Sequence, residues 1–383
     1  MVSPVRPRQT ARLGSGGLRR WWGNRSSAAK MWIQHHVPHR QPSVLIAVHD
    51  YPPRIGGCPA HAHAIASGLH DRGYRVAVLS DRAGSEPFAV NGVRVVTSLS
   101  MLHHCDVVFT YSVSTLTERV GRTLSVIRRP PIWLHYPCAV TYAGLDMVAR
   151  ADRVIAFNPQ DAAITKAVCG SAAKACPVTP AVPDSRRGTI ADGLAFRTRV
   201  GSDYILWVGA WKPAKGVRNL AHRFARLRLD HPEWPIKLVM FGGYGQEEFP
   251  EPHPEIVTFD ANVADIPAAL AGCLFVAFNS PAHPVGYDAN PLILLEAMMN
   301  RKTFVAQAGT PLLDEIGHAG LLVDSDEQWL AAAESLYRNP DRRAALERAG
   351  EQAWHERYNY DRMMAELTDA IDAAVRAGAG AAS

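Results

Sequence analysis

The sequence predicts an α/β protein of two domains, each built around a doubly wound parallel sheet. Short apolar runs alternate with longer helical stretches from residue 43. A proline-rich polar stretch interrupts this alternation, which resumes at residue 204. With 383 residues, 47% of them hydrophobic, the chain can bury two cores. The expected parts are a tail (1–40), an N-terminal domain (41–183), a linker (184–203), a C-terminal domain (204–359) and a terminal segment (360–383).

Residues 1–40 differ in composition from the rest of the chain. They hold eight of the 41 Lys and Arg residues and no acid, so the remainder has 33 basic against 36 acidic residues, a formal charge of −3. That near balance of charge argues against nucleic-acid binding by the chain after residue 40. The composition of the tail favours disorder, or an upstream start with Met31 as an alternative initiator. Its basic charge would still suit contact with anionic lipid or RNA.

The lengths of the apolar runs and the pattern of cysteines indicate the cellular compartment that we expect for the protein. No apolar run approaches the roughly 18 residues of a membrane span, so we expect a soluble protein. The six cysteines form no CxxC pair and have no His/Cys ligand spacing. We therefore expect reduced core cysteines in a cytoplasmic protein, rather than a disulfide framework or a zinc site.

The N-terminal domain begins with a buried strand over residues 43–49, a turn containing Gly56 and Gly57, and a helix over residues 58–72. The two glycines let the backbone approach a ligand closely, although such a pair is more often only a tight turn. His135 ends a later strand, at the edge where ligands collect in such sheets, but a structural hydrogen bond would explain it equally well. Further strands are expected at 93–97, 107–110, 132–135 and 153–156.

The C-terminal domain opens with the strand YILWVG, which ends at Gly209. The loop WKPAKG and a helix over residues 217–230 follow it. Lys215 lies in that loop just before the helix, where its charge could hold a phosphate. The alternative interpretation is that Lys215 is an ordinary solvated lysine.

The stretch GYDANPLILLEAMMNRKTFVA, residues 286–306, combines two carboxylates with the start of a helix. Pro291 suits the first turn of a helix, and residues 292–299 form a mostly apolar run that must be well buried. The free amides from Asn290 to Leu292 would form a phosphate site, which the helix dipole favours. A strand over residues 303–306 is expected to follow.

The two carboxylates of this stretch admit two interpretations. Glu296 is costly to bury in an apolar helix unless a partner donates hydrogen bonds to it, and a ribose diol could be that partner. Alternatively, Glu296 is solvated or internally paired, and Asp288 is a loop residue or an N-cap. The stretch alone favours neither interpretation.

This stretch resembles the donor-binding motif of the retaining GT-B glycosyltransferases of family 4, in which two acidic residues flank seven others before Ala-Met. Asp288 stands in the first acidic place, where the family usually has Glu, and Glu296 stands in the second. The shorter Asp288 would still accept hydrogen bonds from a sugar, with about one methylene less reach.

Two other segments are similar to the same family. The first helix, with His61 four residues after Gly57, resembles the family's first helix. The loop near Lys215 resembles the family signature VGR…EKG, in which Lys215 and Gly216 match the Lys-Gly. Ala210 stands where the family has Arg, which removes half of the usual grip on the diphosphate. The resemblance covers residues 43 to about 377.

The resemblance implies a GT-B fold, in which two Rossmann-like domains enclose the active site in an interdomain cleft and the last helix, about 360–377, crosses back to the N-terminal domain. The implied reaction moves a sugar from a nucleotide diphosphate sugar to a hydroxyl acceptor with retention of configuration. The acceptor would be a glycan, a lipid-linked compound or a small molecule. No metal, no other cofactor and no nucleic-acid partner are expected, and the basic tail could touch a membrane surface.

The resemblance also implies roles for individual residues. Lys215 would stabilise the leaving phosphate, Asp288 would hold the donor sugar, and His135 would face the acceptor. Glu296 would hold the ribose. The expected donor-binding set is Gly57, Gly209, Lys215, Asp288, Ala289, Asn290, Pro291, Leu292 and Glu296.

Two other functions remain open from the sequence. Ala210 and the short Asp288 are compatible with a pseudoenzyme that binds a nucleotide sugar without turning it over. An epimerase acting on a sugar nucleotide would use the same fold and need no acceptor. Resemblance in fold cannot separate these from a transferase.

Overall fold

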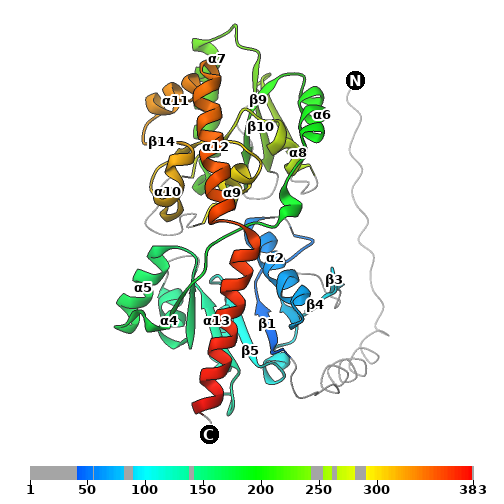
Figure 1. Cartoon of the computed structure of the whole chain (residues 1–383), viewed down its shortest axis with the longest axis vertical. Coiled ribbons are helices and arrows are strands. Elements are labelled where there is room, and N and C mark those ends of the chain that lie inside the picture. Colours follow the sequence, from blue (N-terminus) through cyan, green and yellow to red (C-terminus); the bar gives the residue numbers. More distant parts are fainter. Residues whose placement is uncertain are drawn as a thin grey trace, which may run out of the picture. The chain divides into compact units, whose positions relative to one another are not determined.

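The computed structural model describes residues 41–54, 56–81, 89–137, 142–242, 253–260, 265–280 and 290–381. Pro42–Ser383 cluster into one compact unit, separate from Met1–Gln41. The larger unit holds both predicted α/β halves (Figure 1). Within the described ranges, no helix has the length and apolar character that crossing a membrane requires.

The N-terminal half contains an eight-stranded sheet in the order β3-β4-β2-β1-β5-β6-β7-β8. Its neighbouring strands pair in parallel, except β3 with β4. The strands are β1 (Ser43–Ala47), β2 (Arg75–Leu79), β3 (Ala89–Val90), β4 (Val93–Val96), β5 (Val107–Tyr111), β6 (Ile132–Tyr136), β7 (Arg153–Ala156) and β8 (Ala175–Pro177). The helices are α2 (Gly57–Asp71), η1 (Leu99–His103), α3 (Thr115–Leu124), α4 (Tyr142–Arg150), α5 (Pro159–Cys169) and η2 (Ala172–Lys174), and η3 (Asp184–Arg186) follows in the linker.

The C-terminal half contains a six-stranded sheet in the order β11-β10-β9-β12-β13-β14, paired in parallel throughout. The strands are β9 (Asp203–Val208), β10 (Ile236–Gly242), β11 (Ile256–Asp260), β12 (Phe275–Phe278), β13 (Phe304–Gln307) and β14 (Leu321–Val323). The helices are α6 (Ile190–Val200), η4 (Pro213–Lys215), α7 (Val217–Asp230), α8 (Ile266–Gly272), α9 (Leu292–Met299), α10 (Pro311–Ile316), η5 (Gly317–Ala319), α11 (Asp326–Arg338) and α12 (Pro340–Glu356).

Each sheet has a point at which the order of its strands reverses. In the N-terminal half β1 lies between β2 and β5, and in the C-terminal half β9 lies between β10 and β12. Ligands of doubly wound sheets bind outside the carboxyl ends of the strands at such a point. The loops that leave β1 and β9 are therefore the loops that position the site.

The stretch expected to be a linker, residues 184–203, contains a helix, which corrects that boundary. α6 occupies Ile190–Val200 and packs against α8 of the C-terminal half. It begins with a capping box in which the Thr189 hydroxyl accepts from the Asp192 amide at 3.1 Å and the Asp192 carboxylate accepts from the Thr189 amide at 3.2 Å. The linker is correspondingly shorter.

The way α6 packs explains why its sequence gives only a weak helical signal. An added Cβ on Gly193 would lie 2.7 Å from the backbone of Ala271, so the contact with α8 depends on the absence of a side chain. Ile190 and Leu194, in contrast, are exposed. The buried face of α6 consists of Gly193, Phe196 and Val200, so only two apolar side chains mark it in the sequence.

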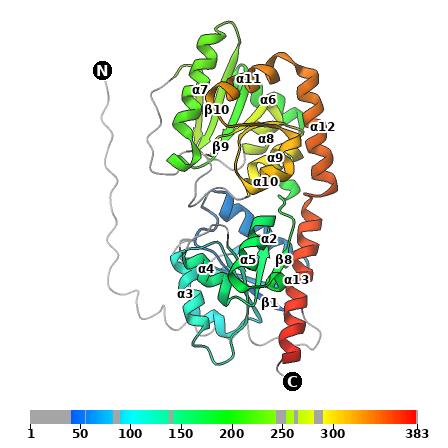
Figure 2. The same ribbon diagram turned by 90° about the vertical axis from the view of Figure 1, so that its left-hand side faces the viewer.

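The last helix, α13 (Tyr360–Ala381), returns to the N-terminal half, as expected from the resemblance (Figures 1 and 2). The Tyr360 hydroxyl donates to the Ala64 carbonyl of α2 at 2.5 Å. The buried face of α13 joins the core of the N-terminal sheet through Met363, Met364, Leu367, Ile371 and Ala374. This face completes a core whose other members precede residue 182 in the chain.

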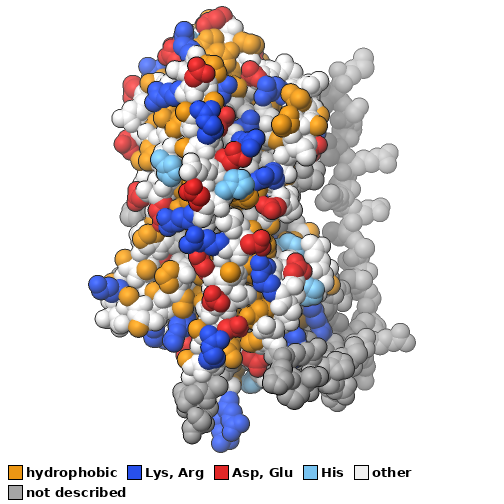
Figure 3. All heavy atoms as spheres, in the orientation of Figure 1, with side chains coloured by type: hydrophobic (Ala, Val, Ile, Leu, Met, Phe, Trp, Pro, Cys, Tyr) orange, Lys and Arg blue, Asp and Glu red, His pale blue; other side chains and the backbone are white. Residues whose placement is uncertain are grey.

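Two further cores cover the faces of the C-terminal sheet. One includes α9 together with α8, α10 and the end of α12, and the other includes α7 and α11. On the molecular face where α12 and α13 lie, acidic and basic side chains are interspersed (Figure 3). This mixture agrees with the near balance of charge calculated for the chain after the tail.

Candidate functional site

The loop after β1 brings Gly57 to the start of α2, at the carboxyl edge of the N-terminal sheet. An added Cβ on Gly57 would meet no atom within 4 Å, so the space beside its backbone is open. A ligand group could approach the first amides of α2 there, as the Gly-Gly pair predicts. Binding of donor phosphates at Gly57 stays a prediction.

The loop after β9 contains Gly209, Ala210 and Lys215. A Cβ on Gly209 would lie 2.8 Å from the Trp207 ring, so packing against Trp207 already accounts for a glycine at this position. Ala210, in the place of the family arginine, is buried. Lys215 is half-buried in the turn that ends at Gly216, directly before α7.

Gly216 adopts a left-handed conformation, with φ +61°, and caps the N-terminus of α7. Its carbonyl accepts a hydrogen bond of 2.7 Å from the Asn279 side-chain amide, at the end of β12. The turn carrying Lys215 is thus attached to a neighbouring strand end of the same sheet. The conformation of this turn is fixed by the fold.

The start of α9 lies where the sequence predicts it, and Leu292 is its first residue. Pro291 precedes the helix as its N-cap residue, one position earlier than expected, and its own side chain makes no capping hydrogen bond. Helix amides that no side chain caps can bind an anion, and among the described residues Pro291 leaves the first amides of α9 uncapped. Asp288 and Ala289 lie outside the described residues, so their expected roles stay predictions.

Asn290 connects the two halves of the protein. Its side-chain nitrogen donates to the Tyr136 hydroxyl at 2.8 Å, and its side-chain oxygen accepts from the Asn158 side-chain nitrogen at 3.4 Å. Tyr136 ends β6, and Asn158 caps α5. The residue that precedes Pro291 and α9 thus contacts the carboxyl edge of the N-terminal sheet.

Asn158 also contacts a buried acid, Asp161. The Asp161 carboxylate accepts hydrogen bonds from the Phe157 amide and the Asn158 side chain, each at 3.1 Å. Burial raises the pKa of Asp161 to about 7, although these hydrogen bonds oppose the increase. A titrating carboxyl therefore lies next to the contact between the halves.

Glu296 is buried and paired with an arginine of the linker. Its Oε1 accepts a hydrogen bond of 2.7 Å from Arg186 Nε, and the two side chains are only 8% and 14% exposed, respectively. The structure therefore contains the internal pairing that the sequence left open. This pairing is compatible with ribose binding, because a carboxylate can accept several hydrogen bonds.

Asn300, one turn after Glu296, attaches the same linker to α9. The Gly188 amide donates to Asn300 Oδ1 at 2.8 Å, and Asn300 Nδ2 donates to the Arg186 carbonyl at 3.1 Å. α9 thus holds the linker at the side chain of Arg186 and at the backbone. Movement of the linker would disturb the surroundings of Glu296.

His135 lies in β6, and its expected role facing the acceptor stays a prediction. The ring is fully buried, and its Nδ1 lies 2.9 Å from the Thr110 hydroxyl. Burial lowers the pKa of His135 to about 3, so the ring is neutral at physiological pH. Because side chains alternate along a strand, the next residue, Tyr136, points to the opposite face and contacts Asn290.

His61, in the first helix, is enclosed by neighbouring elements of the fold. It is buried between Tyr111, whose hydroxyl lies 2.5 Å from Nδ1, and Met363 of α13, whose sulfur lies 3.4 Å from Nε2. Burial lowers the pKa of His61 to about 4. This histidine connects α2 with the sheet and with the returning helix.

Sequence reasoning missed four residues of the site: Tyr136, Asn158, Asp161 and Arg186. Tyr136 could have been found from strand alternation next to His135. Asn158 and Asp161 carry the Asn-Pro-x-Asp pattern of a capped helix, which gives no hint of a contact with the other half. Arg186 has no local signal, because its partner lies 110 positions away.

Residues 202–339 match the protein family described as Glycosyl transferases group 1. A curated relative, D-inositol 3-phosphate glycosyltransferase of Corynebacterium kroppenstedtii, is 26% identical over 214 residues. The alignment covers 52% of this chain and 47% of the relative, so the chain spans about half the length of the curated relative it matches.

Two solved structures are similar along their whole length. Sucrose-phosphate synthase from Thermosynechococcus elongatus superposes with a TM-score of 0.72 and 16% identity, covering 88% of this chain and 100% of that one. HepE from Anabaena, in complex with UDP and glucose, has a TM-score of 0.70 and 16% identity, covering 87% and 100%. These similarities confirm the predicted GT-B fold.

Proposed function

We propose that this chain is a glycosyltransferase that moves a sugar from a nucleotide diphosphate sugar to a hydroxyl acceptor, with retention of the anomeric configuration. One observation carries the proposal. The segment that matches the Glycosyl transferases group 1 family, residues 202–339, includes both the turn of Lys215 and the helix α9, at the carboxyl edge of one sheet. HepE, a structural neighbour, was solved with UDP and glucose, which supports a nucleotide-sugar donor.

The diphosphate of the donor would bind between the turn of Lys215 and the first amides of α9. Lys215 supplies a positive charge, and the helix dipole favours negative charge at the start of α9. The open space beside Gly57 would admit the same phosphates from the N-terminal half. No metal or other cofactor enters this proposal.

Departure of the nucleoside diphosphate determines what the site must stabilise. The bond between the anomeric carbon and the phosphate oxygen breaks, and the acceptor oxygen forms its bond on the same face of the sugar. The departing phosphate oxygen takes the acceptor proton. The charge that develops on the diphosphate is greatest in the transition state, where Lys215 would act.

Glu296 would accept hydrogen bonds from the ribose of the donor while Arg186 holds its Oε1. Asp288 and Ala289 would hold the donor sugar, as the resemblance implies.

The pseudoenzyme remains a second candidate because of one observation. Ala210, where the family has an arginine, is buried and supplies no charge to the diphosphate. Such a pseudoenzyme would bind a nucleotide-sugar donor with the turn of Lys215 and the start of α9, but it would not release a nucleoside diphosphate.

We infer a cytoplasmic location from the reduced cysteines and the nucleotide-sugar donor. The five cysteines among the described residues are free thiols. The basic residues 1–40 would allow peripheral contact with an anionic membrane.

Incubation with a panel of UDP-, GDP- and ADP-sugars tests the proposal. A transferase is expected to release nucleoside diphosphate by slow hydrolysis, and faster when a suitable acceptor is present. An epimerase would instead give a new sugar nucleotide. A donor that binds without any product would identify a pseudoenzyme.

Lys215→Ala provides the matched variant for this assay. Because the charge of Lys215 matters most in the transition state, we expect kcat to fall about 100-fold with little change in melting temperature. Lys166→Ala, at an exposed position on α5, is the control and should keep the wild-type rate. An unchanged rate for Lys215→Ala would remove Lys215 from the site.

A further inference from the structure

The turn that carries Lys215 lies directly against Asn279. A Cβ added to Gly216 would come 2.2 Å from the Asn279 carbonyl oxygen and 2.6 Å from its side-chain nitrogen. That nitrogen donates to the Gly216 carbonyl at 2.7 Å and to the Asn219 side-chain oxygen at 2.9 Å. The position of the turn therefore depends on the orientation of one amide side chain.

Arg223 sets the orientation of that amide. Its Nη1 donates to Asn279 Oδ1, and both side chains are almost completely buried. Hydrogen bonds therefore engage both ends of the Asn279 amide, so a flip of the amide would break bonds on each side. The chain of contacts runs from Arg223 through Asn279 to Gly216.

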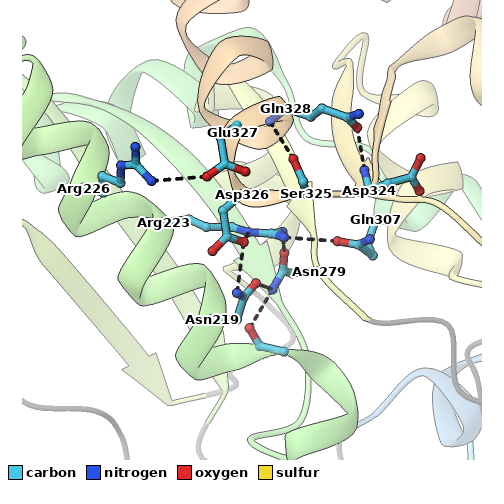
Figure 4. Close-up of polar contacts among 11 residues, drawn as sticks. Asn219, Arg223, Arg226, Asn279, Gln307, Asp324, Ser325, Asp326, Glu327 and Gln328 are labelled. Carbon is cyan, nitrogen blue, oxygen red and sulfur yellow. Dashed lines mark hydrogen bonds and ion pairs between the residues drawn. The ribbon is translucent and has the colours of Figure 1, made fainter.

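Partners from two other elements hold Arg223 in place (Figure 4). Its Nε donates to Asp326 Oδ1, at the start of α11, at 2.7 Å, and its Nη2 donates to Gln307 Oε1, at the end of β13, at 3.3 Å. The hydrogen bond from Arg223 is the main cause that lowers the pKa of Asp326. The guanidinium thus connects α7 to β12, β13 and α11.

The stability of the fold alone gives a weak reason for a charged side chain at position 223. The other buried side chains of α7 that face the core are mostly apolar, and an apolar residue at position 223 would avoid the desolvation of a guanidinium. Arg226 and Glu327 already join α7 to α11 at the surface, with 56% and 73% exposure. The buried network adds a connection from these elements to the turn of Lys215.

We propose that Arg223 is a positioning residue, which acts through Asn279 to hold the Lys215–Gly216 turn in the geometry that donor cleavage requires. The inference rests on the proposed role of Lys215 at the donor diphosphate. Arg223 itself is buried and touches no substrate. Loss of Arg223 would leave the charge of Lys215 present but displaced.

A double-mutant cycle with Lys215 tests the inference. The substrate is the sugar nucleotide of the UDP, GDP and ADP panel that wild type cleaves fastest, and the readouts are kcat, KM and melting temperature. We expect Arg223→Met and Asn279→Ala each to lower kcat at least tenfold, with a smaller change in KM. In a Lys215→Ala background, Arg223→Met should change kcat less than twofold, because the displaced group is already absent.

Arg226→Met is the matched control, since it removes an arginine of the same helix that also contacts α11 but lies outside the network. Its kcat should stay within twofold of wild type. If Arg223→Met does not fold, Asn279→Ala carries the same test, because it breaks the connection and leaves the Arg223–Asp326 pair intact.

The outcomes separate this inference from the proposed function. A tenfold loss that persists in the Lys215→Ala background would show that the network acts on something other than Lys215. An unchanged kcat for both Arg223→Met and Asn279→Ala would also overturn the inference, while a slow Lys215→Ala would leave the proposed function intact. Full activity of Lys215→Ala, or no cleavage of any donor, would overturn both.

Discussion

The Arg186–Glu296 pair changes what a substitution of Glu296 is expected to do. Glu296→Leu leaves Arg186, only 14% exposed, without its carboxylate partner. Removal of one partner of a buried pair costs about 3 kcal/mol or more in the free energy of unfolding. The single variant should therefore be destabilised, although leucine suits an apolar helix. The double variant Arg186→Met with Glu296→Leu should lie much closer to wild type in urea unfolding.

Nucleotide binding then distinguishes a ribose ligand from a purely structural carboxylate. Calorimetric titration with UDP should show a moderately weaker affinity for Glu296→Gln, which keeps one acceptor oxygen, and no measurable binding for Glu296→Leu. Arg186→Met should retain most of the affinity, because it leaves the Glu296 carboxylate in place. Full UDP affinity in a folded Glu296→Leu protein would exclude the ribose role.

Asp161 should produce a measurable pH dependence of stability. Its pKa is about 7 in the folded protein against an ordinary 3.8, so the folded state keeps a proton that the unfolded state releases between these values. The stabilisation is complete below about pH 4 and is lost as the pH rises toward 7, by up to about 1.4 kcal/mol per pH unit.

Asp161→Asn removes this titration and keeps an oxygen that can accept a hydrogen bond. The free energy of unfolding of the variant, relative to wild type, should therefore increase from pH 4 to pH 7 and level off above it. His61, whose pKa is lowered to about 4, gives a slope of opposite sign in both proteins, which cancels in the difference. A difference that does not vary with pH would contradict the assignment.

At the level of elements, α13 is expected to stabilise the N-terminal half. Leu367 is fully buried in the core of that half, so Leu367→Ala should lower the free energy of unfolding by about 3 kcal/mol. Asp369→Ala, two residues later on the exposed face of the same helix, should change it by less than about 0.5 kcal/mol. Equal effects in denaturant unfolding would mean that α13 does not depend on this packing.

Periodicity predicted the regular elements well. The helix expected over residues 217–230 and the apolar run over 292–299 match α7 and α9, because each carries a long, consistent pattern. Helix α6 was not predicted because its close contact with α8 is made by Gly193, which leaves only Phe196 and Val200 as apolar signals of its buried face. A contact that a glycine makes can be recognised only when the surface that packs against the glycine is known.

The candidate site was predicted in part, for a related reason. Lys215, Glu296 and the start of α9 belong to local motifs, so the sequence could indicate them. His135 is fully buried next to Tyr136, and its expected role at the acceptor stays a prediction. Arg186 and Arg223 act through partners distant in sequence, so spacing could not indicate them.

At the level of the whole molecule, the tail and the body should behave independently. Pro42–Ser383 form a compact unit by themselves, and the tail has the composition of a segment that does not pack. Deletion of residues 1–40 should therefore leave the melting temperature and the donor cleavage rate in solution unchanged. A lower melting temperature would mean that the tail stabilises the body, and weaker sedimentation with anionic vesicles would assign it to membrane contact.

The return of α13 to the N-terminal sheet sets an order of events during translation. The core around β1 lacks Met363, Leu367 and Ile371 until the ribosome has synthesised the whole C-terminal half. The C-terminal half, whose cores need nothing beyond Tyr358, can close earlier. The part of the chain made first is thus the part completed last, and a nascent chain stalled before α13 would expose an unfinished apolar surface to chaperones.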